Sequence, residues 1–203
     1  LILLRESNAG TVRERLARET GRSVSACAER VLTLSDGVFD KISEEKSPEG
    51  VICVAKYLDK CKKIATIYSD GKIPGTGETV VLLESVRDPA NVGAIIRSAA
   101  AFGVDRLILS EDCADVYNAK AVRASMGTLF GQTVDRVGDL RGVIGQLRAS
   151  GRRVFAAALD ERAQRLGEFD VHAGDCVVIG NEGHGLSAAV LDAADERVFI
   201  PMS

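Results

Sequence analysis

The sequence predicts an α/β protein in two parts, the larger of which is a mostly parallel sheet covered by helices on both faces. Short continuous apolar runs such as Val80–Leu83 and Cys176–Ile179 are typical of strands that are buried on both faces. Segments with helical periodicity alternate with these runs, and that alternation indicates a mostly parallel sheet. A stretch rich in Gly, Ser, Thr and Pro at residues 68–79 separates this larger part from a smaller one.

Composition limits the class of protein. The chain has 203 residues, of which 46% are hydrophobic and 27% charged, so it can bury a core and is not disordered in composition. No apolar run reaches the ~18 residues that a membrane-spanning helix needs, and the opening Leu1–Leu4 is too short for the core of a signal peptide. The net charge of −3 does not indicate a nucleic-acid-binding protein, so any RNA-binding surface would have to be a local patch.

Cysteine and histidine usage is typical of a cytoplasmic protein without a structural metal. The five cysteines are scattered and never spaced as Cys-x-x-Cys, which predicts reduced, buried thiols. The two histidines, His172 and His184, are far apart and join no cysteine cluster, so we expect no metal site. The cysteines are Cys27, Cys53, Cys61, Cys113 and Cys176.

The chain divides near the stretch rich in Gly and Pro. We expect residues 1–56 to form a partial small α/β unit, residues 57–78 a linker and residues 79–203 the larger α/β domain. Lys56–Lys63, at the boundary, is polar with helical spacing. The chain lacks an initiating Met and stops directly after an apolar run, so we expect a fragment. Its first unit would lack the beginning, and its larger domain would lack the C-terminal end.

The smaller part alternates strands and helices. Asn8 or Thr11 is suited to cap its first helix, and Gly21 lies just past the end of that helix. Pro48 and Gly50 mark the turn into the last strand. The expected elements are strands at Ile2–Leu4, Arg30–Thr33 and Gly50–Ala55, and helices at Thr11–Glu19 and Asp36–Ile42.

The larger part has its own helix signals. Asp88 and Pro89 begin its first helix, and Gly103 ends it. In parallel sheets of this kind, ligands bind outside the carboxyl ends of the strands, so the loops that follow the strands are the candidates for a site. The expected strands are Val80–Leu83, Leu107–Leu109, Gln132–Val134, Val154–Ala158, Cys176–Ile179 and Val198–Ile200, and the expected helices are Asn91–Phe102, Ala119–Met126, Leu140–Ala149 and Leu186–Ala193.

A polar turn between the first strand and the first helix of the larger part carries one candidate site. The segment Glu84–Arg97 places Asn91, Gly93 and Arg97 on the first turns of that helix. Helix N-termini attract anions, and the planar guanidinium of Arg97 is suited to phosphate. Gly93 would let another group approach the backbone closely. For an isolated arginine, a solvated side chain beside a glycine-packed helix contact is the alternative interpretation.

A loop rich in glycine follows the strand Cys176–Ile179. Three glycines in the segment Gly180–Gly185 give the loop unusual backbone freedom, which suits it to wrap a flat ligand or to expose backbone N–H groups. Glu182 would be held in the middle of this loop, at the carboxyl edge of the sheet. The segment is neither a Walker loop nor the glycine pattern of dinucleotide-binding proteins. On composition alone, an ordinary strand-to-helix turn fits equally well.

Together with the apolar run Val198–Met202, these segments resemble the three motifs of the SpoU (TrmH-type) RNA ribose methyltransferases, a branch of the SPOUT superfamily. NVGAIIR at 91–97 is similar to the first motif, GNEGHGL at 180–186 to the second, and IPM at 200–202 to the start of the third. KAVRASMG at 120–127 resembles a further stretch that is common in the family. The resemblance covers residues 80–203, and residues 40–54 are similar to the end of the small substrate-binding domain that often precedes the catalytic domain.

The resemblance implies a knotted α/β catalytic domain that binds S-adenosylmethionine within the knot and works as a homodimer. The implied activity is methylation of a ribose 2′-OH in structured RNA, with ribosomal RNA favoured over transfer RNA by the two-domain layout. Asn91, Arg97 and Glu182 are the implied catalytic residues. The implied cofactor pocket is lined by Leu159, Gly180, Glu182, Gly183, Ile200 and Met202. The third motif of the family continues beyond Ser203, where this sequence stops.

The chemistry of Arg97 favours an electrostatic role over a basic one. A guanidinium stays protonated above a pH of about 12, so it is a poor general base for the ribose hydroxyl. We expect Arg97 to hold a phosphate next to the target ribose and to stabilise the developing alkoxide. Asn91 would orient Arg97 or the ribose, and Glu182 would fix Arg97 or a donor in the loop. No metal ion is required.

The first unit and the linker are the expected RNA-binding surface. Four arginines recur along the first helix and its exit and could contact RNA phosphates, although interleaved glutamates make a solvated helix face equally plausible. Two other classes of protein stay open: a non-catalytic RNA-binding protein that keeps the fold, and an oxidoreductase with a nucleotide cofactor. The absence of a glycine fingerprint after Val80–Leu83 argues against the oxidoreductase. The predicted RNA-binding residues are Arg13, Arg15, Arg18, Arg22 and Arg123.

Overall fold

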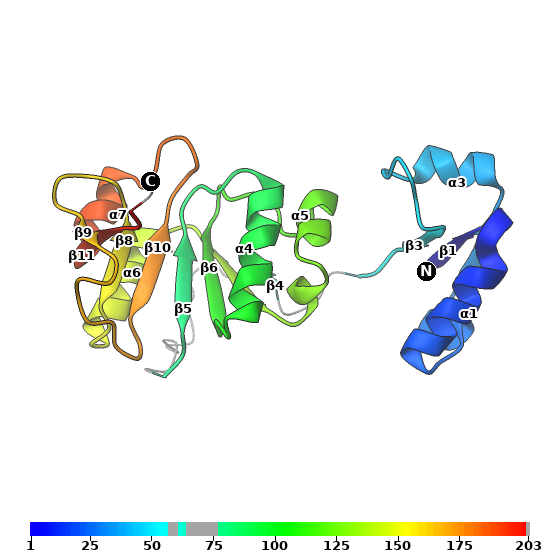
Figure 1. Cartoon of the computed structure of the whole chain (residues 1–203), viewed down its shortest axis with the longest axis horizontal. Helices are drawn as coiled ribbons and strands as arrows, with labels where there is room; N and C mark the ends of the chain where they lie inside the picture. The colour runs from blue at the N-terminus through cyan, green and yellow to red at the C-terminus, as the bar shows by residue number, and fades with distance from the viewer. Residues whose placement is uncertain (57–60, 64–76, 202–203) are drawn as a thin grey trace. The chain divides into compact units, whose positions relative to one another are not determined.

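A computed structural model of the chain describes residues 1–56, 61–63 and 77–201, with the backbone alone for 61–63. The chain forms two compact units, Leu1–Tyr57 and Leu58–Ser203 (Figure 1). The first unit falls in the part predicted as small, and the second holds the large sheet.

The first unit is a three-stranded sheet with helices. β1 (Ile2–Arg5) is the central strand; it pairs in parallel with β2 (Val31–Leu34) and antiparallel with β3 (Val51–Cys53). Leu4 and Val12 are buried in its core together with Ile2 and Val24. Gly21, in the left-handed conformation at φ 67°, ends the first long helix as predicted. The helices are η1 (Glu6–Asn8), α1 (Ala9–Thr20), α2 (Val24–Cys27) and α3 (Asp36–Ile42).

The second unit is an eight-stranded sheet with the strand order β4-β7-β6-β5-β10-β8-β11-β9, and all of its pairings are parallel. This confirms the predicted fold class, and the knot remains an implication of the resemblance. The strands are β4 (Cys61–Lys63), β5 (Val80–Leu83), β6 (Arg106–Ser110), β7 (Thr133–Val137), β8 (Val154–Ala157), β9 (Gln164–Arg165), β10 (Cys176–Ile179) and β11 (Glu196–Phe199). The helices are α4 (Pro89–Ala101), α5 (Ala119–Ala124), η2 (Thr128–Phe130), α6 (Leu140–Ala149) and α7 (Ala188–Ala193).

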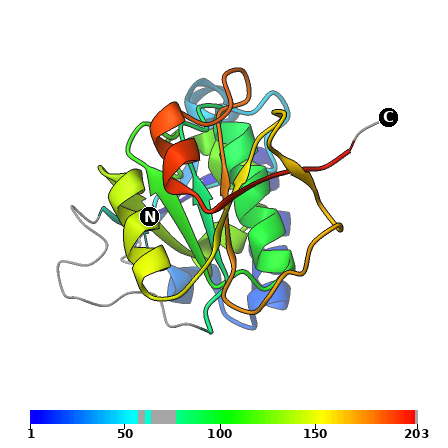
Figure 2. The ribbon, with the colours of Figure 1, turned by 90° about the vertical axis from the view of Figure 1, so that its left-hand side faces the viewer.

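Two cores cover the two faces of this sheet. In β5, Val80 and Leu82 pack with α6 and α7, whereas Leu83 packs with α4 on the other face. In β6, Ile108 belongs to the first of these cores, and its neighbours Leu107 and Leu109 belong to the second. Successive side chains of a strand point to opposite faces of the sheet, and both faces are covered here. These strands are therefore apolar at every position. Figure 2 shows α4 and α6 on opposite sides of the sheet.

Short strands at the margins of the sheet differ from the prediction. Cys61–Lys63 lies in the segment with helical spacing, and that interpretation is wrong for these residues because they form β4 and pair with β7. The range predicted as the linker therefore contributes a strand to the sheet of the second unit. Gln164–Arg165 pairs with β11 at the opposite margin and was not predicted as a strand. Both strands are polar, so no apolar pattern in the sequence marks them.

Among the described residues, no helix is long and apolar enough to cross a membrane. The same residues contain no group of three or more His, Cys, Asp or Glu side chains that could hold a metal ion.

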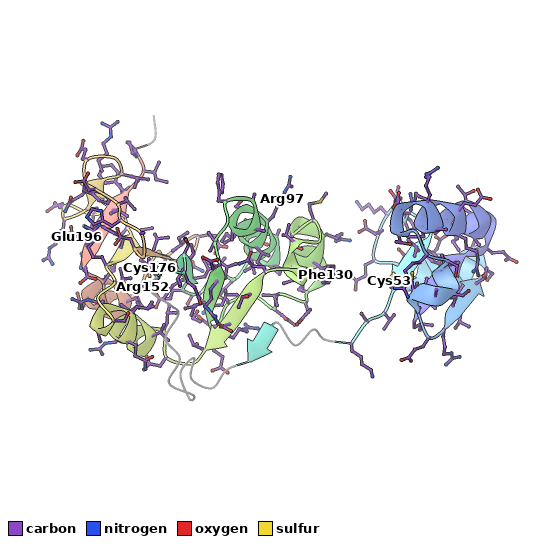
Figure 3. All side chains as sticks on the ribbon, turned by 90° about the horizontal axis from the view of Figure 1, so that it is seen from below. Cys53, Arg97, Phe130, Arg152, Cys176 and Glu196 are labelled. Atoms are coloured by element: carbon purple, nitrogen blue, oxygen red, sulfur yellow. The ribbon has the colours of Figure 1, made fainter. Side chains whose placement is uncertain are left out.

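The prediction of buried cysteines holds for only two of the four whose side chains are described. Cys113 and Cys176 are buried in the cores of the second unit, whereas Cys27 and Cys53 are exposed in the first. Figure 3 labels Cys53 and Cys176. Cys61 has no described side chain. Burial raises the pKa of the Cys113 thiol, and it raises the pKa of the Cys176 thiol to about 11.

Thiol alkylation should separate these cysteines. At pH 8 we expect iodoacetamide to modify Cys27 and Cys53 in the native protein about a hundredfold faster than Cys176. The thiolate is the reactive form, and burial disfavours the thiolate of Cys176. Peptide mass spectrometry over a time course measures the four rates. Denatured protein is the control, in which all four should react alike; equal rates in the native protein would contradict the burial of Cys176.

Candidate active site

Because the strands of the large sheet are all parallel, the loops that follow their carboxyl ends lie along one edge of the sheet. The β5–α4 and β10–α7 loops are neighbours there because β5 and β10 pair directly. Residues from these two loops line an apolar groove of about 560 Å³ that runs along α4. Part of its lining comes from Asn91, Ile95, Phe102, Ile179 and Glu182. The groove places a polar pair, Asn91 and Glu182, next to an apolar surface.

The start of α4 fixes the position of Asn91. The Asp88 side chain accepts a hydrogen bond of 2.8 Å from the backbone N–H of Ala90, and Pro89 occupies the first turn. This is the start that the sequence predicts, because the side chain of Asp satisfies a free N–H and Pro needs none. Asn91 therefore sits within the first turn of a well-capped helix.

The glycine-rich loop is closed on itself. Asn181 and Gly185 exchange two backbone hydrogen bonds of 3.0 Å each, and Gly185 has a φ of +68°. Gly180 lies so close to this closure that a Cβ atom added to it would be 2.5 Å from the backbone nitrogen of Leu186. Gly180 is thus required by the loop itself. The closure leaves Glu182 exposed at the tip of the loop.

The two candidate motifs meet through one hydrogen bond. Asn91 Nδ2 donates to Glu182 Oε1 at 2.8 Å. This bond is the main cause that holds the pKa of the Glu182 carboxyl below its usual value; backbone hydrogen bonds from Glu182, Asp88 and Arg87 lower it further, while burial opposes them. Glu182 therefore stays ionised throughout the neutral range and holds the amide of Asn91 in one orientation.

Arg97 does not join this pair within the described part of the chain. Its side chain is exposed, and it has no hydrogen bond or ion pair to any described residue. Figure 3 shows it projecting outward from α4. Each residue turns an α-helix by about 100° and advances it by about 1.5 Å, so Arg97 lies roughly 120° around α4 from Asn91 and about 9 Å further along. Glu182 thus fixes Asn91; of the two partners expected for it, Arg97 or a donor in the loop, it forms no hydrogen bond with Arg97 among the described residues.

Gly93 has a structural function in addition to its place in the motif. A Cβ atom at this position would overlap the backbone oxygen of Ala121 and would lie 2.7 Å from Ala124 Cβ. The group that approaches the backbone of Gly93 is therefore α5, not a ligand. This close contact holds α4 against the neighbouring helix of the same face.

The residues predicted to bind the cofactor gather at three adjacent strands. Leu159 follows β8, Gly180 follows β10 and Ile200 follows β11, and β8 pairs with both of the other strands. Leu159 and Ile200 are 85% and 68% exposed. Gly183 is exposed in the glycine-rich loop. Met202 lies outside the described residues.

The predicted RNA-binding arginines differ in their surroundings. Arg15 forms an ion pair of 2.6 Å with Glu49, and Arg22 donates to the backbone oxygen of Ala26 at 2.9 Å. Arg18 is exposed and Arg13 half-buried on the same helix. Arg123 is exposed on α5 in the other unit. Two of the four arginines of the first unit are therefore engaged within that unit, and of these four Arg18 is exposed and has no hydrogen bond or ion pair to a described residue.

Three residues at this edge were not identified from the sequence. Asn181, Ser85 and Glu84 connect the two candidate loops through side-chain hydrogen bonds. The only signal was their position, because Asn181 directly precedes Glu182, and Glu84 and Ser85 directly follow β5. The sequence does not show which backbone atom a polar side chain will reach.

Comparisons with known proteins bear on this arrangement. A sequence profile described as the SpoU rRNA Methylase family matches residues 78–203, more than half of the chain. The Bacillus subtilis protein named 23S rRNA (guanosine(2553)-2′-O)-methyltransferase RlmP is 29% identical over 197 residues, which cover 95% of this chain and 73% of that protein. The Streptomyces viridochromogenes 23S rRNA (uridine(2479)-2′-O)-methyltransferase is 38% identical over 127 residues, which cover 61% of this chain and 44% of that protein.

Solved structures are similar over the whole chain. The AdoMet-bound rRNA methyltransferase from Sinorhizobium meliloti superposes with a TM-score of 0.73 at 27% identity, covering 100% of this chain and 70% of that one. The SpoU methyltransferase AviRb from Streptomyces viridochromogenes, in complex with AdoMet, gives a TM-score of 0.67 at 28% identity and covers 100% of this chain and 73% of that one. The chain belongs to the SpoU rRNA methylase family.

Proposed function

We propose that this protein transfers a methyl group from S-adenosylmethionine to a ribose 2′-oxygen in structured RNA, with ribosomal RNA as the substrate class. The observation that carries the proposal is the hydrogen bond between Asn91 and Glu182, which joins the two family motifs at the carboxyl edge of the sheet. Two relatives named as 23S rRNA 2′-O-methyltransferases support the choice of ribosomal RNA.

The residues present fit this cofactor. Leu159 and Ile200 expose apolar side chains at adjacent strand ends, where a flat adenine could cover them. The closed loop between Gly180 and Gly185 places backbone groups and an ionised carboxylate next to that surface. S-adenosylmethionine (AdoMet) supplies an electrophilic methyl group on a sulfonium. The same compound is bound in two solved relatives.

Asn91 is suited to hold the ribose. One of its amide N–H groups goes to Glu182, and its Oδ1 atom has no hydrogen-bond partner among the described residues. That oxygen is therefore left as an acceptor for the 2′-OH, and the ionised partner on the nitrogen side makes the carbonyl a better acceptor. Glu182 acts on the hydroxyl only through Asn91 in this arrangement. Orientation of the hydroxyl before attack then contributes to the rate.

Arg97 holds the RNA and stabilises charge. Its exposed guanidinium is free of partners among the described residues, so it is open to the phosphate next to the target ribose. Because Arg97 does not face Asn91 within one subunit, the same charge would favour the alkoxide that develops at the ribose across the proposed contact between two copies. Arg13, Arg15, Arg18, Arg22 and Arg123 are the further candidates for phosphate contacts, with Arg15 and Arg22 released from their present partners.

A homodimer in the cytoplasm completes the proposal. Ile95 and Phe102 line the apolar groove along α4 together with Asn91, and a second copy would cover such a surface. The active site would then lie near the contact between the two copies. Analytical ultracentrifugation gives the oligomeric state directly.

Two measurements test the function. Isothermal titration with S-adenosylmethionine should show binding, whereas a non-catalytic RNA-binding protein with a degenerate pocket would not bind it. Mapping of ribose methylation across total RNA, with and without the gene, should show one lost position in ribosomal RNA. A methylated position lost from transfer RNA would change the proposed substrate to transfer RNA. If no RNA lost a methylated position, the proposed activity would be rejected.

A further inference from the structure

We propose that Asn181 is a positioning residue, which docks the glycine-rich loop on the exit of β5 so that Glu182 meets Asn91. The inference deepens the function proposed above and rests on it. It assigns a role to a residue that neither touches the ribose nor belongs to the predicted catalytic set.

Both polar atoms of the Asn181 side chain form hydrogen bonds. Its Nδ2 atom donates to the backbone oxygen of Ser85 at 2.7 Å. Its Oδ1 atom accepts from the backbone nitrogens of Gly183 and His184, at 2.8 and 3.1 Å. The oxygen thus shapes the turn that carries Glu182, and the nitrogen ties that turn to the neighbouring loop. One side chain therefore controls both the shape and the placement of the loop.

The oxygen of Ser85 that receives Asn181 is itself held in place. Ser85 has a φ of +56°, a left-handed conformation that is uncommon for a residue other than glycine. Its backbone nitrogen donates to Ser110 Oγ at 2.8 Å, and its Oγ atom donates to Asp112 Oδ2 at 2.5 Å. Ser110 Oγ donates to the other oxygen of Asp112 at 2.6 Å. Three fixed bonds therefore maintain a costly backbone conformation that aims the Ser85 carbonyl at Asn181.

The far end of the loop is fastened to the same segment. The Glu84 carboxylate accepts from the backbone nitrogen of Ser187 at 2.7 Å and from its hydroxyl at 2.6 Å. Glu84 and Ser85 thus hold the loop at its end and at its beginning. Glu182 lies between these two attachments, and Asn91 is the residue whose side chain hydrogen-bonds its carboxylate. The bond from Asn181 thus gives the beginning of the loop a side-chain attachment that matches the one Glu84 makes at its end.

Kinetics test the placement. We expect Asn181→Asp to lower kcat by about a hundredfold. It keeps the acceptor for Gly183 and His184 but turns a carboxylate oxygen toward the Ser85 carbonyl, whose repulsion displaces the loop, and a misplacement of about 1 Å is enough for such a loss. KM for the RNA and the thermal midpoint should change little. Gln132→Ala is the matched control: it also removes an amide that donates to a backbone oxygen, that of Val104 at 2.8 Å, but before the amino end of β7. It should lower stability and leave kcat within about twofold of the parent value.

A cycle with Glu182→Ala tests whether Asn181 acts through Glu182. In single-turnover assays with excess enzyme, Asn181→Asp should cost less than about twofold once Glu182 is removed. A hundredfold loss in that background as well would overturn the inference, since a purely structural role does not depend on Glu182. An unchanged kcat for Asn181→Asp in the parent protein would also overturn it.

Hydrogen exchange of the ligand-free protein gives a readout that needs no activity. In Asn181→Ala the amides of Gly183 and His184 should lose protection by tenfold or more, whereas in Asn181→Asp they should keep it. Equal protection in both variants would contradict the assigned hydrogen bonds. If the parent protein methylates no RNA, the proposed function fails while the exchange result still stands, so the two failures can be told apart.

Discussion

Replacement of Arg97 by alanine should reduce methyl transfer by about 10²- to 10³-fold while binding of S-adenosylmethionine is retained. The reason is that a guanidinium beside the reacting oxygen acts on charge that develops only in the transition state. Arg97 is exposed, so its loss leaves no buried group without a partner and should not affect folding. Single-turnover methylation measures the rate, and isothermal titration measures cofactor affinity.

Two further variants sharpen the interpretation of Arg97. Arg97→Lys keeps the charge but loses the planar fork that matches a phosphate, so it should recover only part of the rate. Arg141→Ala removes another exposed arginine, on α6, which packs on the other face of the sheet, and should leave the rate unchanged. Equal turnover by Arg97→Ala and the parent protein would exclude the proposed role of this residue.

Replacement of Gly93 by alanine should destabilise the second unit by about 1–3 kcal/mol, although alanine is the better helix former. The added methyl group would overlap the backbone oxygen of Ala121, and backbone cannot move aside as a flexible side chain can. α4 would have to shift away from α5. Because α4 carries both Asn91 and Arg97, we expect the rate of methyl transfer to fall together with stability.

Gly145 provides the matched control for Gly93. It also lies inside a helix, α6, but a Cβ atom added to it would meet no atom within 4 Å. Gly145→Ala should therefore stabilise the protein by about 0.5–1 kcal/mol, the ordinary gain of alanine over glycine in a helix. Urea unfolding followed by circular dichroism gives both values. A stabilised Gly93→Ala variant would contradict the close contact between α4 and α5.

The elements that could be predicted well are those whose own residues determine them. β5, β10 and α6 have the predicted bounds, because an apolar run or an amphipathic repeat ends at a clear turn or cap. β4 and β9 could not be predicted, since they are polar and exist only through pairing with β7 and β11. Such pairing depends on residues far away in the sequence.

The candidate site was likewise predictable only in part. The motifs identified Asn91 and Glu182, which are 91 residues apart and form a hydrogen bond. Their resemblance to a family did not show that Arg97 projects from another side of α4. Nor could it show that Gly93 serves the contact with α5, because that requires knowledge of which helix lies alongside. Asn181 was missed because its partner is a backbone oxygen. Every residue has such an oxygen, so the sequence does not show which one a side chain will bind.

The order of strands in the large sheet constrains how the chain can fold during synthesis. β10 enters between β5 and β8, and β11 enters between β8 and β9, although both are made after those strands. Until residues 196–199 leave the ribosome, β8 therefore keeps one open hydrogen-bonding edge, which is a template for wrong pairing. Distant pairings of this kind also slow folding. The nascent chain thus passes through a long interval in which its growing sheet must be protected from intermolecular association.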